Sequence, residues 1–380
     1  MRTLHLPPGL GPKARGLHHG RAFAREIAEI ASIRSELAQA QGLFRSDDEL
    51  MAVAALHLPV LRAFDVDLHD ELVGIAEGAG LAPERLVVLN HYTDLKDLDP
   101  RVALGASAVD APADARVRPH DEDCSAIVAS SPEGALLAQT WDMHGSAEPY
   151  VALLHVPETV DSDGRIRPEA WLLTITGCLG MAGMNAAGLG ITINNLKSQD
   201  ARVGLVWPAL VRRVLAERDA VSARDVVLAA PLGSGHHYLV ADAERAFGIE
   251  TSGRLAEVWA EADLTRAAAG FHHENHCLGV EVAKVSSIGP TSTTLERHAW
   301  IEASLKGRPV EGLSDLWERL GSHEGHPRGV CTHLASPSSP HAMKTCAGFA
   351  MNLTQRRAWA ASGCLHGVAP EWLPFGRGAD

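Results

Sequence analysis

The hydrophobic pattern of this chain changes abruptly near residue 124. Before that point apolar residues recur at helical spacing, and the segment AREIAEIASIR places Ile27 and Ile30 on one face. Gly78 and Gly80 are expected to end the last helix of this region. After residue 124, short apolar runs bounded by Gly, Pro, Asp and Ser are typical of strands. The pattern therefore predicts a helical N-terminal segment followed by a strand-rich remainder.

The connection between the two regions and the order of the later elements indicate a layered fold. Residues 101–120 are rich in Ala, Pro, Asp and Arg without an amphipathic period, which predicts a loop or linker. CSAIVAS and ALLAQTWDM, joined by residues 131–134, predict a hairpin. Further hairpins are expected at HYLVADAERAFGIETSG and around Thr354–Arg357, and helices at VWPALVRRVLAERDA and SARDVVLAAPL. Blocks of strands that alternate with blocks of helices indicate layers of helices and antiparallel sheets.

Composition and charge narrow the class of protein. A length of 380 residues fits one large domain or two ordinary ones. The formal charge of −13 repels phosphate backbones, so nucleic acid is not expected as a partner. The N-terminus lacks the apolar core of a secretory signal, and the longest apolar stretches are too short to span a bilayer. Six scattered cysteines without a CxxC pair indicate free thiols, and a cytoplasmic location is expected.

Cys124 lies where the linker meets the first predicted strand. Cleavage of the bond between Asp123 and Cys124 would free an α-amino group on the residue that carries the thiol. An α-amino group titrates near ~8 and a thiol near ~8.5. One residue would then supply both the nucleophile and its base. Taken alone, a cysteine that opens a strand is more often a small core residue.

Three further positions carry groups that such a nucleophile needs. The carboxylate of Asp142, at the end of the predicted hairpin, could hold a freed ammonium, or it could cap a turn. Asn194 and Asn195 are expected to end a strand, where a backbone N–H can face a developing oxyanion, although an Asn-Asn turn is the alternative. The side-chain amide of Asn275 could form the other half of an oxyanion hole, or be a plain polar strand residue.

The segment around Asn275 also carries groups that bind metals. These are His272, His273, Glu274, His276 and Cys277. A tetrahedral site needs ligands that converge, whereas adjacent residues of an extended segment point to opposite faces. No second cluster with standard spacing completes a site. Neither a metal nor a cofactor is therefore expected, and a histidine-dependent metallohydrolase remains an alternative.

Taken together, these segments resemble the acyl-coenzyme A:6-aminopenicillanic acid (isopenicillin N) acyltransferase family, N-terminal-nucleophile hydrolases related to the choloylglycine hydrolases. The similarity covers most of the chain, through GLHHGRAFAREI, DCSAIVAS, QTWDMHG, GMNAAGLGITINN, YLVADAERAFGIETS, ENHCL, GVCTH and TCAGFAMNLTQRRAWAASG. It implies an α+β fold, the four-layer αββα sandwich. It also implies self-cleavage before Cys124 into a small chain of residues 1–123 and a large chain of residues 124–380, the catalytic domain.

The resemblance implies residue roles as well. Cys124 matches the nucleophile, Asp142 the carboxylate that positions the freed amine, and Asn275 the oxyanion-hole side chain. Asn195 matches the neighbouring oxyanion or positioning asparagine.

The chain departs from the family pattern at three positions. Asp123 stands where the family often has glycine, which puts processing in question more than the nucleophile. Lys344 is nearest to an arginine expected at the start of the last hairpin, but a lysine lacks the bidentate fork of arginine. Gln139 stands where related bile-salt hydrolases carry an arginine. Lys344 and Gln139 are the candidate substrate-binding residues.

The expected activity is cleavage or transfer of acyl groups at amide or thioester bonds through an acyl-enzyme on cysteine. The expected partner is a small-molecule amide or acyl thioester, with no nucleic acid and no membrane, and a homo-oligomer is compatible with the sequence. Two alternatives remain, the metallohydrolase and a non-catalytic binding protein on the same fold.

Overall fold

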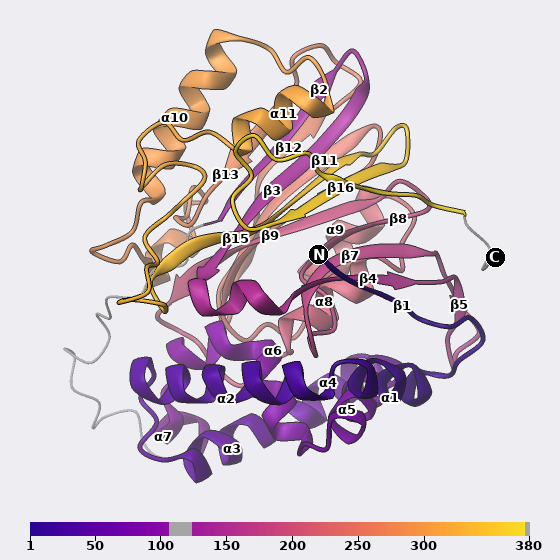
Figure 1. Ribbon diagram of the computed structural model, residues 1–380, viewed down its shortest axis with the longest axis vertical. Coiled ribbons are helices and arrows are strands. Elements are labelled where there is room, and N and C mark those ends of the chain that lie inside the picture. The colour runs from indigo at the N-terminus through magenta and orange to yellow at the C-terminus, as the bar shows by residue number, and fades with distance from the viewer. Residues whose placement is uncertain (106–123, 377–380) are drawn as a thin grey trace.

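The computed structural model describes residues 1–105 and 124–376, in which helices enclose two stacked β-sheets (Figure 1). The N-terminal helices lie at one end of the view and α10 and α11 at the other, with the sheets between them. The N-terminal helices are α1 (Pro12–Ala22), α2 (Ala24–Gln41), α3 (Asp47–Ala55), α4 (His57–Phe64), α5 (Val66–Ala79), α6 (Pro83–Asp97) and α7 (Pro100–Ala103). The later helices are α8 (Trp207–Val214), α9 (Ala220–Leu228), α10 (Thr294–Gly307) and α11 (Leu313–Leu320).

The larger sheet has nine strands in the order β1-β4-β7-β8-β9-β10-β11-β12, with β14 paired to β9. Its strands are β1 (Arg2–His5), β4 (Val151–Val156), β7 (Ala170–Ile175), β8 (Ala182–Asn185), β9 (Gly190–Ser198), β10 (Gly235–Ala241), β11 (Arg245–Thr251), β12 (Ala256–Asp263) and β14 (Ser286–Ser287). Strand β1 was not expected from the sequence, and it pairs in parallel with β4. The N-terminal segment therefore adds a strand to this sheet as well as a helical layer.

The smaller sheet has six strands in the order β13-β2-β3-β15-β16-β17. They are β13 (Gly270–His273), β2 (Ser125–Ser131), β3 (Gly134–His144), β15 (Met343–Asn352), β16 (Arg357–Ser362) and β17 (Glu371–Leu373), and a separate pair joins β5 (Thr159–Val160) to β6 (Ile166–Arg167). Short 3-10 turns lie at η3 (Gly145–Tyr150) and η4 (Val282–Val285). The three predicted hairpins are confirmed as β2–β3, β10–β11 and β15–β16.

Alternate residues of β2 show how the layers are stacked. Ala126 and Val128 belong to the large core shared with the nine-stranded sheet, whereas Ile127 and Ala129 belong to a second core. The second core also contains Ile301 of α10 and four apolar residues of α11. On the far side of the nine-stranded sheet, α6 contacts β9 and α9 contacts β10 and β11. The order helices, sheet, sheet, helices confirms the expected αββα class.

Two sequence expectations near the site are wrong in detail. Asn194 and Asn195 lie inside β9, which continues to Ser198, so they do not end the strand. Strand β13 ends at His273, so Asn275 lies in the connection that follows it. Within the described parts of the chain, every helix is too short or too polar to cross a bilayer.

Candidate active site

Cys124 directly precedes β2 and is held at both ends of its backbone. Its nitrogen donates to Oδ1 of Asn275 at 2.7 Å. Its carbonyl oxygen accepts from Nδ2 of Asn194 at 3.1 Å and from Nη1 of Arg297 at 2.7 Å. The thiol lies against β3, with Sγ 3.7 Å from the carbonyl oxygen of Asp142. Only 5% of Cys124 is exposed, so these contacts hold a buried residue at the start of β2.

Asn275 uses both ends of its side chain. Oδ1 accepts from the nitrogen of Cys124 and from Nη2 of Arg297 at 3.0 Å. Nδ2 donates to the backbone carbonyl of Asn195 at 2.9 Å. Its own backbone nitrogen donates to Oγ1 of Thr294 at 2.9 Å. An amide nitrogen carries two N–H groups, and these contacts engage one of them.

The neighbouring asparagines of β9 face opposite ways, as the period of a strand requires. The side chain that reaches Cys124 is that of Asn194, which is fully buried and also donates to the carbonyl of His273 at 3.3 Å. Nδ1 of His237 lies 3.0 Å from Oδ1 of Asn194 and helps to orient it. Asn195 contributes its backbone carbonyl, which receives Nδ2 of Asn275. The oxyanion role assigned to Asn195 stays a prediction.

Asp142 is fully buried near the end of β3. Oγ1 of Thr140 lies 3.4 Å from its carboxylate and accepts the backbone N–H of Ser125 at 3.0 Å, so a short chain of hydrogen bonds joins Asp142 to the start of β2. Burial and then the negative charge of Asp142 raise the pKa of the Cys331 thiol to about 12. The negative charge of the Asp142 carboxylate therefore disfavours ionisation of a nearby thiol, because charges interact more strongly in a buried setting than in water.

Arg297 is a site residue that the sequence analysis missed. It lies in the first turns of α10, is 1% exposed, and donates through Nη1 to the carbonyl of Cys124 and to Oγ of Ser125 at 2.8 Å. Nη2 reaches Asn275, and Nε donates to Oγ1 of Thr293 at 2.9 Å. The buried face of α10 carries Thr294 and Arg297 beside Ile301, so no apolar period predicts this helix. An arginine in such a segment is ordinarily read as a surface residue.

The histidine-rich segment divides among several partners. Nδ1 of His272 lies 3.0 Å from Glu274, and His273 points elsewhere, with Nε2 2.8 Å from Glu250. Nδ1 of His276 lies 2.9 Å from Oγ1 of Thr294. The candidate metal ligands of this segment therefore do not converge on one point. Two of them, His272 and Glu274, come together with His298, which is outside the predicted set.

The carboxylate of Glu274 is buried beside two histidines. Burial alone would raise its pKa, but hydrogen bonds with His272 and His298 and the nearby charge of Arg297 lower the pKa to about 2. The hydrogen bond to Glu274 raises the pKa of His298. These hydrogen bonds connect α10, which carries His298, to β13, which carries His272.

Gln139 and Lys344, the candidate substrate-binding residues, both have protein partners. Gln139 is buried in β3, where Nε2 donates to the carbonyl of Ile193 at 3.0 Å and Oε1 accepts from the nitrogen of Ile193 at 3.0 Å. These bonds link the two sheets. Lys344, in β15, forms an ion pair with Glu148 of η3. Substrate binding by either residue stays a prediction.

Comparisons with known proteins decide the family. The family described as acyl-coenzyme A:6-aminopenicillanic acid acyl-transferase matches residues 130–363. The chain belongs to this family. A relative, the acyl-coenzyme A:6-aminopenicillanic-acid-acyltransferase 40 kDa form of Emericella nidulans, is 25% identical over 336 residues, which cover 86% of this chain and 84% of the relative. The resemblance expected from the sequence is confirmed, and it supports acyl transfer or amide hydrolysis as the kind of reaction.

Two solved structures are similar over part of the chain. Penicillin V acylase from Agrobacterium tumefaciens is 13% identical, covers 66% of this chain and 86% of its own, and has a TM-score of 0.41. A mutant of conjugated bile acid hydrolase from Clostridium perfringens is 10% identical, covers 67% of this chain and 97% of its own, and has a TM-score of 0.40.

Proposed function

We propose that this member of the family cleaves or transfers acyl groups through an acyl-enzyme on Cys124, after self-cleavage of the bond between Asp123 and Cys124. The observation that carries the proposal is the setting of Cys124. Its nitrogen lies 2.7 Å from Oδ1 of Asn275, and its Sγ lies 3.7 Å from the carbonyl oxygen of Asp142. Asp123 is outside the described residues, so the proposed cleavage rests on the chemistry of Cys124.

Activation uses the same thiol as the later reaction. The Cys124 thiol adds to the carbonyl carbon of Asp123, and the peptide C–N bond breaks with its nitrogen leaving as the α-amine of Cys124. Water then hydrolyses the thioester and leaves a carboxylate on Asp123. The new amine replaces the amide nitrogen that Oδ1 of Asn275 accepts from, so Asn275 is placed to hold it. Asp142 supplies a buried negative charge that favours the ammonium form of this amine.

Turnover then uses the thiol and the freed α-amine of Cys124. The α-amine takes the proton of the thiol, and the thiolate attacks the substrate carbonyl. The second N–H of Asn275 is the donor proposed for the oxyanion, which carries charge only after attack. The amine returns the proton to the leaving nitrogen or sulfur. Water or an acceptor amine then resolves the acyl-enzyme.

Arg297 is proposed as a positioning residue. It contacts the carbonyl of Cys124 and Oδ1 of Asn275, so it would fix the position of the nucleophile relative to the oxyanion donor. The substrates are proposed as small-molecule amides or acyl thioesters. The Emericella relative is named for an acyl-coenzyme A donor and a 6-aminopenicillanic acid acceptor, and we propose the same chemical classes of donor and amine acceptor here.

Intact-mass measurement of the purified protein tests the proposal. The wild-type protein should separate under denaturing conditions into two chains, the larger beginning at Cys124. Cys124→Ala should remain one chain and lose activity, whereas the matched control Cys277→Ser should process normally. A wild-type chain that stays intact through prolonged incubation would contradict the proposal of self-cleavage. Activity in Cys124→Ala equal to that of the wild type would show that Cys124 is not the nucleophile.

A further inference from the structure

Four side chains outside the candidate active site converge on one point. They are His323, Cys331, His333 and Cys364, whose donor atoms all lie within 4.8 Å of one another. Nε2 of His323 lies 3.2 Å from Sγ of Cys364 and 3.2 Å from Nε2 of His333. Sγ of Cys331 lies 3.4 Å from Nε2 of His333 and 3.7 Å from Sγ of Cys364. Two sulfurs and two imidazole nitrogens thus form one compact group of possible metal ligands.

These separations match the edges of a tetrahedron around zinc. Zn–S bonds of about 2.3 Å and Zn–N bonds of about 2.05 Å place two sulfurs roughly 3.8 Å apart, two nitrogens roughly 3.3 Å apart, and sulfur and nitrogen roughly 3.6 Å apart. The S–S separation of 3.7 Å, the N–N separation of 3.2 Å and two of the four S–N separations, 3.2 and 3.4 Å, are close to these values. The other two S–N pairs lie within 4.8 Å. A disulfide would bring the sulfurs to about 2.05 Å, and both cysteines are free thiols.

We propose that His323, Cys331, His333 and Cys364 bind one Zn²⁺ as a closed structural site. Two thiolates and two imidazoles in tetrahedral geometry are the ligands that select zinc among common divalent metals. On binding, the two thiols release two protons to solvent, and the two thiolates balance the double positive charge of the ion. Four protein ligands leave no open position, so this ion holds structure and takes no part in the acyl transfer proposed for Cys124.

The site joins segments that border Asp142. Thr332, between the ligands Cys331 and His333, exchanges two hydrogen bonds with Thr345 of β15, at 2.8 and 2.9 Å. Thr345 pairs with Asp142 across the β3–β15 ladder. Cys364 follows β16, which pairs with β15 on its other side. A zinc ion here would therefore fasten the long connection after α11 to the sheet beside Asp142.

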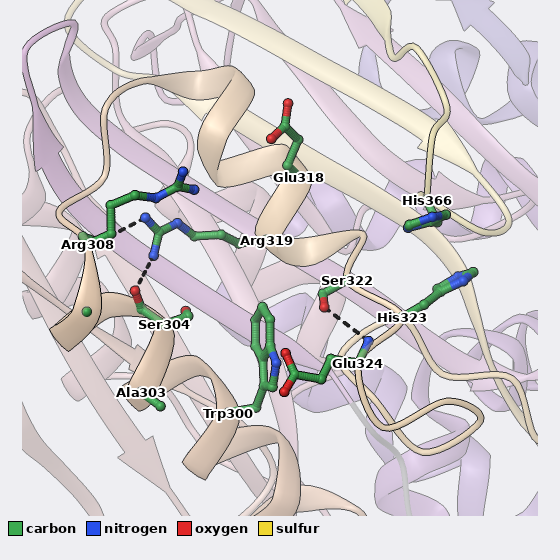
Figure 2. Close-up of a pocket in the computed structure, with 11 residues that line it drawn as sticks. Trp300, Ala303, Ser304, Arg308, Glu318, Arg319, Ser322, His323, Glu324 and His366 are labelled. Carbon is green, nitrogen blue, oxygen red and sulfur yellow. Dashed lines mark hydrogen bonds between the residues drawn. The ribbon is translucent and has the colours of Figure 1, made fainter.

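One of the four proposed ligands, His323, borders solvent. His323 lines a surface hollow of about 610 Å³ between α10 and α11, together with Trp300 and Arg319. Figure 2 shows the rings of His323 and His366 lying face to face at the edge of this hollow, with their centroids 4.1 Å apart. Nδ1 of His366 lies 3.0 Å from the carbonyl of Gly321, so this stack holds His323 from outside the ligand set.

Elemental analysis of the full-length protein tests the proposal directly. The wild-type protein, incubated with one equivalent of Zn²⁺ and desalted, should retain one zinc per chain. Replacement by Co²⁺ should give thiolate-to-cobalt charge-transfer absorption and the ligand-field bands of a tetrahedral site. Cys364→Ser and His333→Ala should each lose the retained metal. Cys277→Ser and His341→Ala, which change the same residue types outside the cluster, should keep it.

A measurement on the wild-type protein keeps the test valid if a ligand variant fails to fold. Treatment with a zinc chelator should lower the melting temperature by several degrees, and one equivalent of Zn²⁺ should restore it. The proposal is overturned if the wild-type protein retains no zinc, if mass analysis finds a Cys331–Cys364 disulfide in the freshly purified protein, or if the control variants lose the metal as fully as the ligand variants. None of these readouts depends on activity, so the result is separate from the fate of the proposed function.

Discussion

Cys124 is held by residues that lie far from it in the sequence. Asn194, Asn275 and Arg297 contact its backbone, and they come from β9, the connection after β13, and α10. Asn275 combines two tasks, because Oδ1 accepts from the nitrogen of Cys124 and Nδ2 carries the N–H proposed for the oxyanion. A change at Asn275 should therefore affect both processing and turnover.

Asn275→Ala should lower turnover by about 100- to 1000-fold, which corresponds to roughly 3–4 kcal/mol of transition-state stabilisation. KM should change much less, because the ground-state carbonyl gains little from a donor aimed at the oxyanion. Self-cleavage should slow as well, since the acceptor for the nitrogen of Cys124 is lost. Steady-state kinetics of the processed fraction and the time course of cleavage measure the two effects, with circular dichroism as the check on folding. A folded variant with turnover within a few-fold of wild type would mean that other groups build the oxyanion hole.

Helices α1 and α5 pack against each other through glycines. Gly16 and Gly20 of α1 face Gly74 and Gly78 of α5, and a Cβ added at Gly20 would lie 2.2 Å from the carbonyl oxygen of Ile75. Gly78 and Gly80 were expected to end this helix, and Gly80 does cap its C-terminus in the left-handed conformation, whereas Gly78 does not end it. Gly78 lies inside α5, where an added Cβ would lie 2.6 Å from the carbonyl oxygen of Leu17. Pairs of glycines four residues apart on one face let the two backbones approach closely.

Gly20→Ala should destabilise the protein because the new methyl group meets backbone atoms that cannot move aside. Overpacking of this kind costs about 1–3 kcal/mol in the free energy of unfolding. Gly307→Ala is the matched control, since an added Cβ at the end of α10 meets nothing within 4 Å and should change stability by less than about 0.5 kcal/mol. Urea unfolding of both variants gives the comparison. Equal stability of the two variants would contradict the close packing of α1 on α5.

The N-terminal segment and the rest of the chain are interlocked across the whole molecule. Strand β1 pairs with β4, and Glu71 of α5 is fully buried between Arg15 of α1 and Arg212 of α8. Nη1 of Arg212 lies 2.8 Å from the carboxylate, and Nε of Arg15 lies 3.1 Å from it. If the chain is cut before Cys124, these contacts join the two products. The two chains should then stay associated until the protein unfolds.

The charge of Glu71 predicts how stability changes in acid. Burial would raise its pKa, but the two arginines lower the pKa to about 2 from the ordinary value of 4.5. Because the folded-state pKa is lowered, the contribution of Glu71 is present above pH 4.5 and is lost as pH falls from there toward 2. Glu71→Gln should cost about 3–5 kcal/mol at neutral pH, since it leaves two buried arginines without their carboxylate, and should flatten the acid dependence.

Unfolding by urea at several pH values, in the uncleaved Cys124→Ala background, measures this effect. Glu77→Gln is the matched control, because Glu77 pairs with Lys13 between the same two helices but is more than half exposed. It should change stability by no more than about 1 kcal/mol. The assignment fails if Glu71→Gln and its background lose stability equally between pH 4.5 and 2.

The sequence by itself determined the elements whose pattern is local. Most helices of the first third, α8, α9 and the three hairpins follow from periods of 3.6 and 2 within each segment. The sequence left α6 open between a helix and a short strand, and it predicted a loop from residue 101, where the short helix α7 lies. Helix α11 was not predicted, although its apolar residues carry the same signal, at Leu313, Leu316, Trp317 and Leu320. Cys124 was singled out because composition and pattern change at that residue, and the family motifs named Asp142 and Asn275. The structure brings these three residues together, which the local sequence pattern could not predict.

Only the tertiary structure decided which groups meet. Asn194 faces Cys124 and Asn195 does not, because a shift of one residue in a strand turns each side chain to the other face. Arg297 reaches the site from a helix without an apolar stripe. The four proposed zinc ligands lie on loops, and the first and last of them, His323 and Cys364, are 41 residues apart in the sequence. These contacts depend on the stacking of the two sheets and on the paths by which the long connections return to them. The free energy of that packing is spread over residues distant in sequence, so no short window of the chain contains it.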